Sequence, residues 1–268
     1  NTCINFSYRI GCTPMQNRHI FIGWDNREAI GAIVCKYSIL YNTHNDDDLS
    51  VNFLNQRDLR QQKLYYRKSF LNASGQYFDS LDNKPFSTEF SFTRFLVPEA
   101  CRHQNLEGWA LFMDGDIVVN TDIHNLFDLA DDRYAVMCVK FNWLPEKTER
   151  YKMDGVIQTR YNKKLWSSLM LFNLSHPSVK KLDHITVNQS TGSHLHKFKW
   201  VADRDIGPLP EEWNFVPGVT PNHTPPMAIH YTKGGPWFEE YRDCDYSEVW
   251  IDYLDAVPKT FIVNNLLS

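Results

Sequence analysis

Short apolar runs alternate along the chain with amphipathic and polar segments, the pattern of a domain in which strands and helices follow one another. Two runs are apolar without interruption, residues 110–113 and the core of 167–173, and such runs are typical of strands buried on both faces. The remaining predicted strands cover residues 19–24, 51–54, 134–141, 213–216 and 227–231. The pattern therefore predicts a central sheet.

Helical segments separate these runs. The clearest begins at Asp25-Asn26, which cap it, and continues to about Leu40, with an acid in its first turn. Further helices are predicted at residues 59–70, 99–104, 121–129, 176–187 and 248–256. Residues 72–91 are loop-like, and residues 145–164 are polar without a period, which is typical of a lid, a binding loop or disorder.

The opening strand, tight turn and helix form half of a βαβ unit of the nucleotide-binding type. We therefore predict an α/β protein with a mixed, mostly parallel central sheet flanked by helices. Residues 1–18 are polar and aperiodic, and we expect them to be an N-terminal extension. Residues 19–268 are expected to form a single domain.

Composition excludes several classes of function. With 268 residues and 43% hydrophobic content the chain can bury a sizeable core. A net charge of −4 and scattered lysines and arginines predict no nucleic-acid partner. No apolar stretch is long enough to span a membrane, although peripheral association with one stays open. Six scattered cysteines without a C-x-x-C pair favour a reducing compartment, so we expect a cytoplasmic protein, with the inner membrane face as an option.

Chemistry-bearing residues follow the apolar run at 110–113. Asp114, Gly115 and Asp116 lie directly after it, where open α/β sheets bind their ligands, and apolar residues resume at Ile117. Paired carboxylates suit a hard divalent ion such as Mg²⁺ or Mn²⁺. Other D-x-D triplets occur at 46–48, 203–205 and 243–245, but only 114–116 combines a buried strand with an intervening glycine. We predict a metal site there.

A second group follows the predicted strand at 227–231. His230 ends that strand, and a neutral imidazole can complete a carboxylate metal site. Lys233 supplies positive charge, and Gly234 and Gly235 would let backbone amides approach a phosphate closely. A core-edge histidine before an ordinary Gly-Pro turn is the plainer interpretation of the same residues.

Together these motifs resemble a known family. The D-x-D after an apolar strand, S-x-x-L-F-N, L-P-x-x-W-N and H-Y-x-K-G-G-P-W resemble the GT-A glycosyltransferases. They look most like the family-8 type, which includes glycogenin and bacterial lipopolysaccharide galactosyl- and glucosyltransferases. The resemblance covers roughly residues 19–240 and implies the Rossmann-like GT-A fold. It implies sugar transfer from a nucleotide-diphosphate donor, expected to be a UDP-sugar, to a glycan or glycolipid acceptor with retention of configuration.

The resemblance also implies roles for individual residues. Asp114, Asp116 and His230 would hold Mn²⁺ or Mg²⁺ against the diphosphate. The cofactor and donor contacts would come from Phe21, Gly23, Trp24, Asp25, Arg94, Gly115, Lys233, Gly234, Gly235 and Trp237. The first four match the uracil and ribose pocket, and Arg94 matches an arginine near the donor. Asp203 and Arg204 fall where the family contacts the transferred sugar, and are the expected catalytic residues.

The chain departs from the family pattern at two positions that face the sugar. Arg204 replaces the usual glutamine, and Trp166-Ser-Ser168 stands where N-x-G is usual. Arg204 cannot act as a base at neutral pH, so it would bind a phosphate or carboxylate if it points into the site. The sequence therefore predicts the fold and the metal site more firmly than it predicts the identity of the transferred sugar.

Two other classes of function remain open. Residues 111–118 also fit the haloacid dehalogenase phosphatase pattern, with Asp114 as nucleophile, but that pattern leaves His230 and Lys233 without a role. A non-catalytic carbohydrate-binding module would make Asp114 and Asp116 incidental. Metal-dependent binding of a nucleotide separates both alternatives from a glycosyltransferase.

Overall fold

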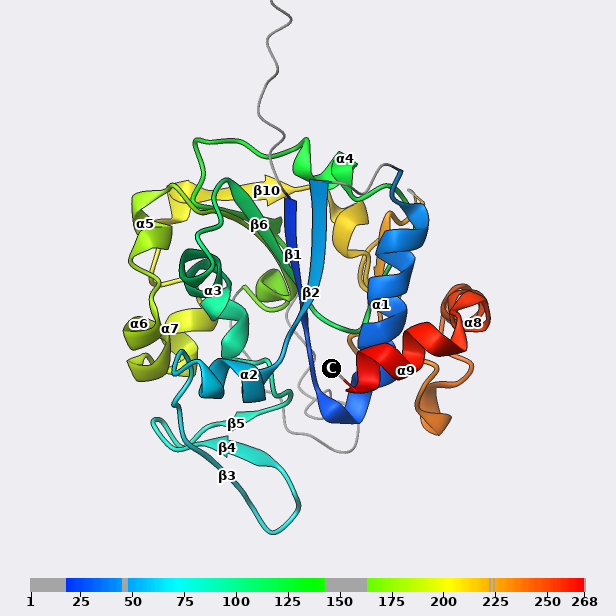
Figure 1. Cartoon of the computed structure of the whole chain (residues 1–268), viewed down its shortest axis with the longest axis horizontal. Coiled ribbons are helices and arrows are strands. Elements are labelled where there is room, and N and C mark those ends of the chain that lie inside the picture. The colour runs from blue at the N-terminus through cyan, green and yellow to red at the C-terminus, as the bar shows by residue number, and fades with distance from the viewer. Residues whose placement is uncertain (1–17, 45–47, 143–162, 222, 224, 268) are drawn as a thin grey trace, which may run out of the picture.

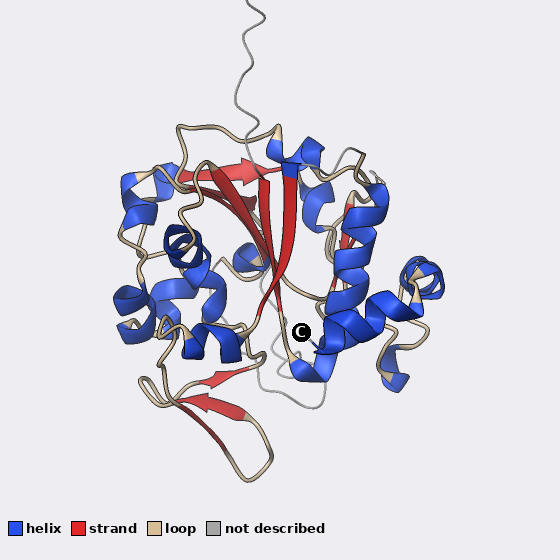
Figure 2. Ribbon diagram, in the orientation of Figure 1, coloured by secondary structure: helices blue, strands red, loops and turns tan. Residues whose placement is uncertain are grey.

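A twisted six-stranded sheet forms the centre of the molecule (Figures 1 and 2). The computed structural model describes residues 18–44, 48–142, 163–221, 223 and 225–267. In spatial order the strands are β10 (Ile206–Leu209), β8 (Val136–Val139), β9 (Leu169–Asn173), β6 (Trp109–Met113), β1 (Arg18–Gly23) and β2 (Leu49–Leu54). Neighbouring strands are parallel except at β9, which runs antiparallel to both β6 and β8. The predicted mixed, mostly parallel sheet is confirmed.

Helices cover both faces of this sheet. In Figure 1, α1 (Ala29–Asn42), α8 (Ser247–Ala256) and α9 (Lys259–Leu267) lie on one side of it. The other side carries α3 (Val97–His103), α5 (Pro177–Lys180), α6 (His184–Gln189) and α7 (Gly192–His196). Two short helices also follow strands: α2 (Gln56–Gln61) comes after β2, and α4 (His124–Phe127) comes after β7 (Ile117–Val119). This three-layer arrangement is what a mostly parallel sheet requires, because both of its faces must be covered.

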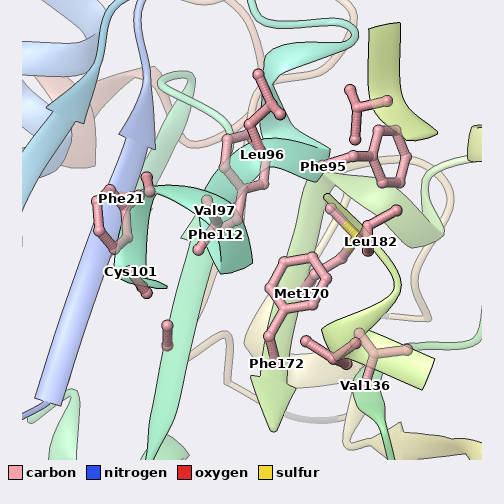
Figure 3. Packing of buried hydrophobic residues seen from close by; sticks show 14 of the residues in the cluster. Phe21, Phe95, Leu96, Val97, Cys101, Phe112, Val136, Met170, Phe172 and Leu182 are labelled. Atoms are coloured by element: carbon pink, nitrogen blue, oxygen red, sulfur yellow. The ribbon is translucent and has the colours of Figure 1, made fainter. Parts of the chain in front are cut away.

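Successive side chains of each strand enter different layers of the core, as the two-residue period of a strand dictates. Phe21 of β1 and Phe112 of β6 lie in the cluster beneath α3 (Figure 3). Ile20 and Leu111, one position away, lie in the cluster beneath α1. Because both of their faces are apolar, the strands β1, β6 and β9 carry no exposed residue, and burial fixes their register.

Two smaller sheets flank the centre. The antiparallel pair β7 (Ile117–Val119) and β11 (Ala228–His230) continues the chain beyond β6 and brings a late segment against it. The strands β3 (Ser69–Leu71), β4 (Tyr77–Asp79) and β5 (Pro85–Phe86) form a second antiparallel sheet below the main body in Figure 1. The pair of β7 and β11 positions the candidate site.

The structure differs from the predicted elements in several places. The predicted helix at 59–70 is wrong: α2 ends at Gln61, because Lys63 adopts a left-handed backbone (φ 61°), and β3 follows. The predicted strand at 213–216 is wrong, since residues 211–214 form the 3-10 helix η7 (Glu211–Asn214). The edge strand β10, next to β8, was not predicted, because its Gly207 and Pro208 are unusual in strands. An edge position tolerates proline. Most of the predicted loop at 145–164 lies outside the described residues.

Candidate metal centre

Three side chains from two distant segments converge at the carboxyl end of β6. Asp114 follows β6 directly, and Asp116 precedes β7. The antiparallel register places His230 opposite Ile117, and the Tyr231 amide donates to the Asp116 carbonyl at 3.0 Å. As a result, His230 Nε2 lies 3.3 Å from Asp116 Oδ1 and 4.0 Å from Asp114 Oδ2. The candidate ligand atoms of all three residues lie within 4.8 Å of one another.

The chemistry of this donor set fits a divalent cation. All three residues are buried, and His230 has no exposed surface. Nε2 is buried and has no hydrogen-bond partner among the described residues, while Nδ1 lies 2.8 Å from Asn214 Oδ1. An amide oxygen only accepts, so Nδ1 carries the proton and Nε2 presents its lone pair toward two carboxylates. Two carboxylate oxygens and one imidazole nitrogen suit Mn²⁺, and also Mg²⁺.

Arg94 supports the centre from within the protein. Its Nη1 lies 3.0 Å from Asp114 Oδ1 and donates to the Ser167 carbonyl at 2.8 Å. The guanidinium also lies against the rings of Phe90 and Phe112, each 5.2 Å from the ring centroid. Arg94 is itself buried, so it contributes positive charge behind Asp114 and offsets part of the cost of burying two carboxylates.

Gly115 permits the two loops of the centre to meet. A Cβ built on Gly115 would lie 2.6 Å from the Gly23 carbonyl oxygen and 3.1 Å from the Ala32 Cβ. Backbone atoms cannot yield as a flexible side chain does, so any other residue here would displace the turn between Asp114 and Asp116. The glycine is therefore required because the last residue of β1 lies so close to the chain that follows β6.

Two of the predicted diphosphate contacts after β11, Gly234 and Gly235, are closely packed by aromatic rings. The Gly234 amide donates to the Tyr231 carbonyl at 2.8 Å, and the Tyr241 ring occupies the space of a Gly234 side chain. The Trp237 ring fills the corresponding space at Gly235. Lys233 is exposed beside this turn. Trp237 also borders Gly31, which lies beside the Gly115 carbonyl, so this turn packs near the segment that carries the two aspartates.

The residues expected around the nucleoside are mostly buried. Phe21 lies in the core, so only its backbone is left for a ligand, and Phe90 covers Gly23. Trp24 Nε1 donates to Asn26 Oδ1 at 3.1 Å. The Asp25 carboxylate accepts from the Arg27 amide, the Arg27 guanidinium and the Glu89 amide.

An open pocket lies beside these buried residues. It has a volume of about 390 Å³ and is bordered by Asn26 after β1, by Asn55 after β2, and by Tyr77, Phe86 and Glu89. Its volume lies in the range of small-ligand sites, and amides, aromatic rings and a carboxylate converge on it. Chemically, these groups suit a polar ring compound with both donors and acceptors.

Asp203 and Arg204 lie apart from the metal ligands. They belong to the 3-10 helix η6 (Asp203–Asp205) before β10, which is three strands from β6 in the sheet. The Asp203 side chain is 83% exposed and pairs with Lys163 Nζ at 2.5 Å. The hydrogen bond from Lys163 lowers the pKa of Asp203, so Asp203 is a carboxylate at neutral pH. The Arg204 side chain is 88% exposed.

Sequence reasoning gave no role to three residues around the centre. Asn214, which bonds His230, ends the L-P-x-x-W-N motif, so a signal for it was present. Ser168 lies in one of the departures from the family pattern, and its carbonyl accepts from the Asp114 amide at 2.8 Å. Cys35 is fully buried, and this burial is the main cause that raises the pKa of its thiol. The negative charges of Asp116 and Asp114 raise this pKa further. Cys35 therefore stays a neutral thiol.

Comparison with solved structures supports the fold. The chain superimposes on the apo-form glycosyltransferase GlyE of Streptococcus pneumoniae TIGR4 with a TM-score of 0.56 and 18% identity, over 94% of this chain and 63% of that one. This chain thus spans less than two thirds of the GlyE chain. The galactosyltransferase LgtC, solved with donor and acceptor sugar analogues, gives a TM-score of 0.50 and 13% identity, over 91% of this chain and 98% of its own. The fold is GT-A.

Sequence comparison gives the family. The model of glycosyl transferase family 8 matches residues 5–186, and "Protein CDI" of Arabidopsis thaliana is 39% identical over 263 residues, 96% of this chain and 92% of that protein. The chain belongs to glycosyltransferase family 8, and it is a glycosyltransferase. Family membership decides against the phosphatase and the non-catalytic binding module. Among the described residues, no helix is long and apolar enough to cross a membrane.

Proposed function

We propose that this enzyme transfers a sugar from a UDP-sugar to a glycan or glycolipid acceptor, with retention of configuration, using Mn²⁺ or Mg²⁺ held by Asp114, Asp116 and His230. The observation that carries the proposal is the convergence of these three buried side chains, whose ligand atoms lie within 4.8 Å. Membership of family 8 supports it independently of the geometry.

The residues of the centre suit the departure of a nucleoside diphosphate. Breaking a sugar–phosphate bond builds negative charge on the leaving group, and a bound dication stabilises such charge. Lys233, in the turn that packs against the centre, adds positive charge on the side open to solvent. Arg94 is committed to Asp114 and Ser167, so we assign it the positioning of Asp114 rather than direct donor binding.

The nucleoside is proposed to lie at the carboxyl ends of β1 and β2. The pocket bordered by Asn26, Asn55 and Tyr77 opens there, beside the predicted positions Gly23 to Asp25. Asp25 would act indirectly, because its carboxylate holds Arg27 and the Glu89 amide. This location agrees with the general rule that open α/β sheets bind ligands beyond their carboxyl ends.

The transferred sugar is proposed to contact Asp203, with Arg204 beside it. Asp203 is ionised at neutral pH and therefore suits the stabilisation of a cationic, oxocarbenium-like sugar rather than proton donation. The retaining outcome rests on family resemblance. An NMR spectrum of the first-formed product that showed an inverted anomeric bond would refute it.

A reducing compartment is proposed for the protein. Cys35, Cys101, Cys138 and Cys244 are free thiols in the structure, and the first three are buried. Persistent free cysteines are usual in cytoplasmic proteins. Peripheral association with a membrane remains compatible with a glycolipid acceptor.

The test of the proposed function is calorimetric titration of UDP, GDP, CDP and ADP, each with and without Mn²⁺. We expect UDP to bind in the presence of Mn²⁺ and this binding to be lost in Asp116→Ala. The matched control is Asp131→Ala, which removes a carboxylate of a surface pair with Arg133. Metal-dependent binding of another nucleotide would change the donor, and the absence of any nucleotide binding would refute the proposal.

A further inference from the structure

A chain of buried hydrogen bonds leads from the metal centre to a serine of another segment. His230 Nδ1 lies 2.8 Å from Asn214 Oδ1, and Asn214 Nδ2 lies 2.8 Å from Ser168 Oγ. Ser168 Oγ in turn donates to the Leu165 carbonyl at 2.6 Å. His230 and Asn214 have no exposed surface and Ser168 is 2% exposed, so water does not compete for these bonds.

The donor and acceptor in each of these hydrogen bonds can be assigned from the protons that each group carries. A serine hydroxyl has one proton, and the 2.6 Å separation from the Leu165 carbonyl, which can only accept, assigns that proton to this bond. Ser168 Oγ must then accept from Asn214, which turns the amide oxygen of Asn214 toward His230. His230 Nδ1 must therefore donate, and Nε2 carries the lone pair that faces Asp114 and Asp116.

The opposite direction is the competing state. If Ser168 donated to Asn214, the amide nitrogen would face His230 Nδ1, and the proton of a neutral imidazole would move to Nε2. That proton would then point at Asp116 Oδ1, 3.3 Å away, and occupy the position between the three ligands. The two directions therefore differ in whether the imidazole is ready to bind a cation.

We propose that Ser168 and Asn214 are positioning residues that fix His230 in the tautomer with a bare Nε2 and so prepare the centre for its metal ion. The inference rests on the metal role of His230 in the proposed function. Ser168 serves both halves of the centre, because its carbonyl also accepts from the Asp114 amide. The hydroxyl is supplied by the same departure from the family pattern, N-x-G to Trp166-Ser-Ser168, that the sequence left without a role.

The first readout is the tautomer itself. Long-range ¹H–¹⁵N correlation spectra of metal-free protein, at a pH where imidazoles are neutral, report which nitrogen of His230 is protonated, with His230→Gln for assignment. We expect protonated Nδ1 in the wild type, a shift toward protonated Nε2 in Asn214→Ala and Ser168→Ala, and retention of protonated Nδ1 in Asn214→Asp. Asn214→Asp is the conservative rescue, because a carboxylate oxygen still accepts from Nδ1.

The second readout is the affinity for Mn²⁺ alone, measured by electron paramagnetic resonance on the metal-free protein. Loss of the partner that orients a ligating histidine typically weakens metal binding by about 10–100-fold, which we expect for Asn214→Ala. We expect a loss of roughly tenfold for Ser168→Ala, which leaves Asn214 in place. The control is Asn173→Ala, a buried amide at the other end of β9 that bonds the Tyr134 carbonyl and the Ser175 amide, and its affinity should equal that of the wild type.

The outcomes separate the inference from the function on which it rests. Protonated Nε2 in the wild type, or unchanged tautomer and affinity in Asn214→Ala, would overturn the positioning role. If Asn214→Ala does not fold, the wild-type spectrum and Ser168→Ala decide in the same way. Unchanged Mn²⁺ affinity in His230→Ala would instead overturn the metal role of His230, whatever its tautomer.

Discussion

The metal centre and the 3-10 helix η6 carry the same kind of sequence motif but differ in every physical respect. Asp114 and Asp116 are buried and face a histidine from another segment, and Arg94 pairs with Asp114. Asp203 and Arg204 are exposed, and within the described part of the chain Asp203 pairs with Lys163. Burial with several partners fixes a carboxylate in one position, whereas an exposed pair contributes little to position or stability.

The difference lies in the surrounding chain rather than in the triplet. Asp114-Gly-Asp116 is preceded by five fully or nearly fully buried residues of β6 and followed by buried β7, so the backbone around it is fixed on both sides. Asp203-Arg-Asp205 follows the exposed Ala202, and only its last residue adjoins a strand. A motif therefore predicts a preorganised site only where the flanking elements are themselves buried.

The largest expected effect comes from removing a ligand of the buried centre. Asp116→Ala should reduce the rate of sugar transfer by about 10³-fold, roughly 4 kcal/mol, because the developing charge on the leaving diphosphate loses its dication. Initial rates with a UDP-sugar and Mn²⁺ measure this, and Asp131→Ala at the surface should keep the wild-type rate. Equal rates in both variants would erase the contrast between buried and exposed carboxylates.

The next effect concerns the buried ion pair behind the centre. Arg94→Met should lower the free energy of unfolding of the metal-free protein by about 3 kcal/mol, since it leaves Asp114 buried without its cation. Saturating Mn²⁺ should restore part of this loss by supplying the missing positive charge. Denaturant unfolding with and without Mn²⁺ measures both quantities.

The control for Arg94 is an exposed arginine that also pairs with an aspartate. Arg133→Met removes the partner of Asp131, but Arg133 is 79% exposed, so the free energy of unfolding should equal that of the wild type within the error of the measurement. A loss as large as that of Arg94→Met would show that burial does not separate the two pairs.

A smaller effect is expected at the turn between the two aspartates. Gly115→Ala should cost about 1–2 kcal/mol of stability and weaken Mn²⁺ binding, because the added methyl group meets the Gly23 carbonyl. Gly192→Ala is the matched control: its nearest neighbour, a ring atom of Phe92, would lie at 3.4 Å, and its stability should not fall. Equal Mn²⁺ affinity in Gly115→Ala and wild type would mean that the turn tolerates displacement.

Sequence patterns predicted the sheet better than its edges. Strands with continuous apolar runs, such as β6 and β9, were predicted because burial on both faces leaves no polar position. The edge strand β10 was missed, since Gly207 and Pro208 weaken its pattern and only its tertiary partner β8 stabilises it. The helix predicted at 59–70 was wrong because Lys63 adopts a left-handed backbone conformation, which a lysine in the sequence does not indicate.

The candidate site divides in the same way. Asp114, Asp116 and His230 could be predicted as a set, because each ends or follows an apolar strand and their chemistry is complementary. The saturation of Asp25 by Arg27 and Glu89, and the chain from His230 to Ser168, depend on side-chain contacts between segments far apart in the sequence. Periodicity and spacing do not report such contacts.

The smallest structural effect, and the sharpest test of the comparison, is Asp203→Asn. Asp203 is exposed, so the free energy of unfolding should change by less than about 0.5 kcal/mol. Its pKa lies below the usual value because Lys163 donates to the ionised form, so the substitution removes a full negative charge at neutral pH. If that charge stabilises the sugar cation, transfer should slow by about tenfold while Mn²⁺-dependent UDP affinity stays unchanged. Lys163→Met distinguishes the effect of the ion pair from that of the Asp203 charge, since it removes the partner and keeps the carboxylate. A wild-type transfer rate in Asp203→Asn would show that Asp203 has no role in sugar transfer. Of the two D-x-D triplets compared, only the buried one would then have a catalytic role.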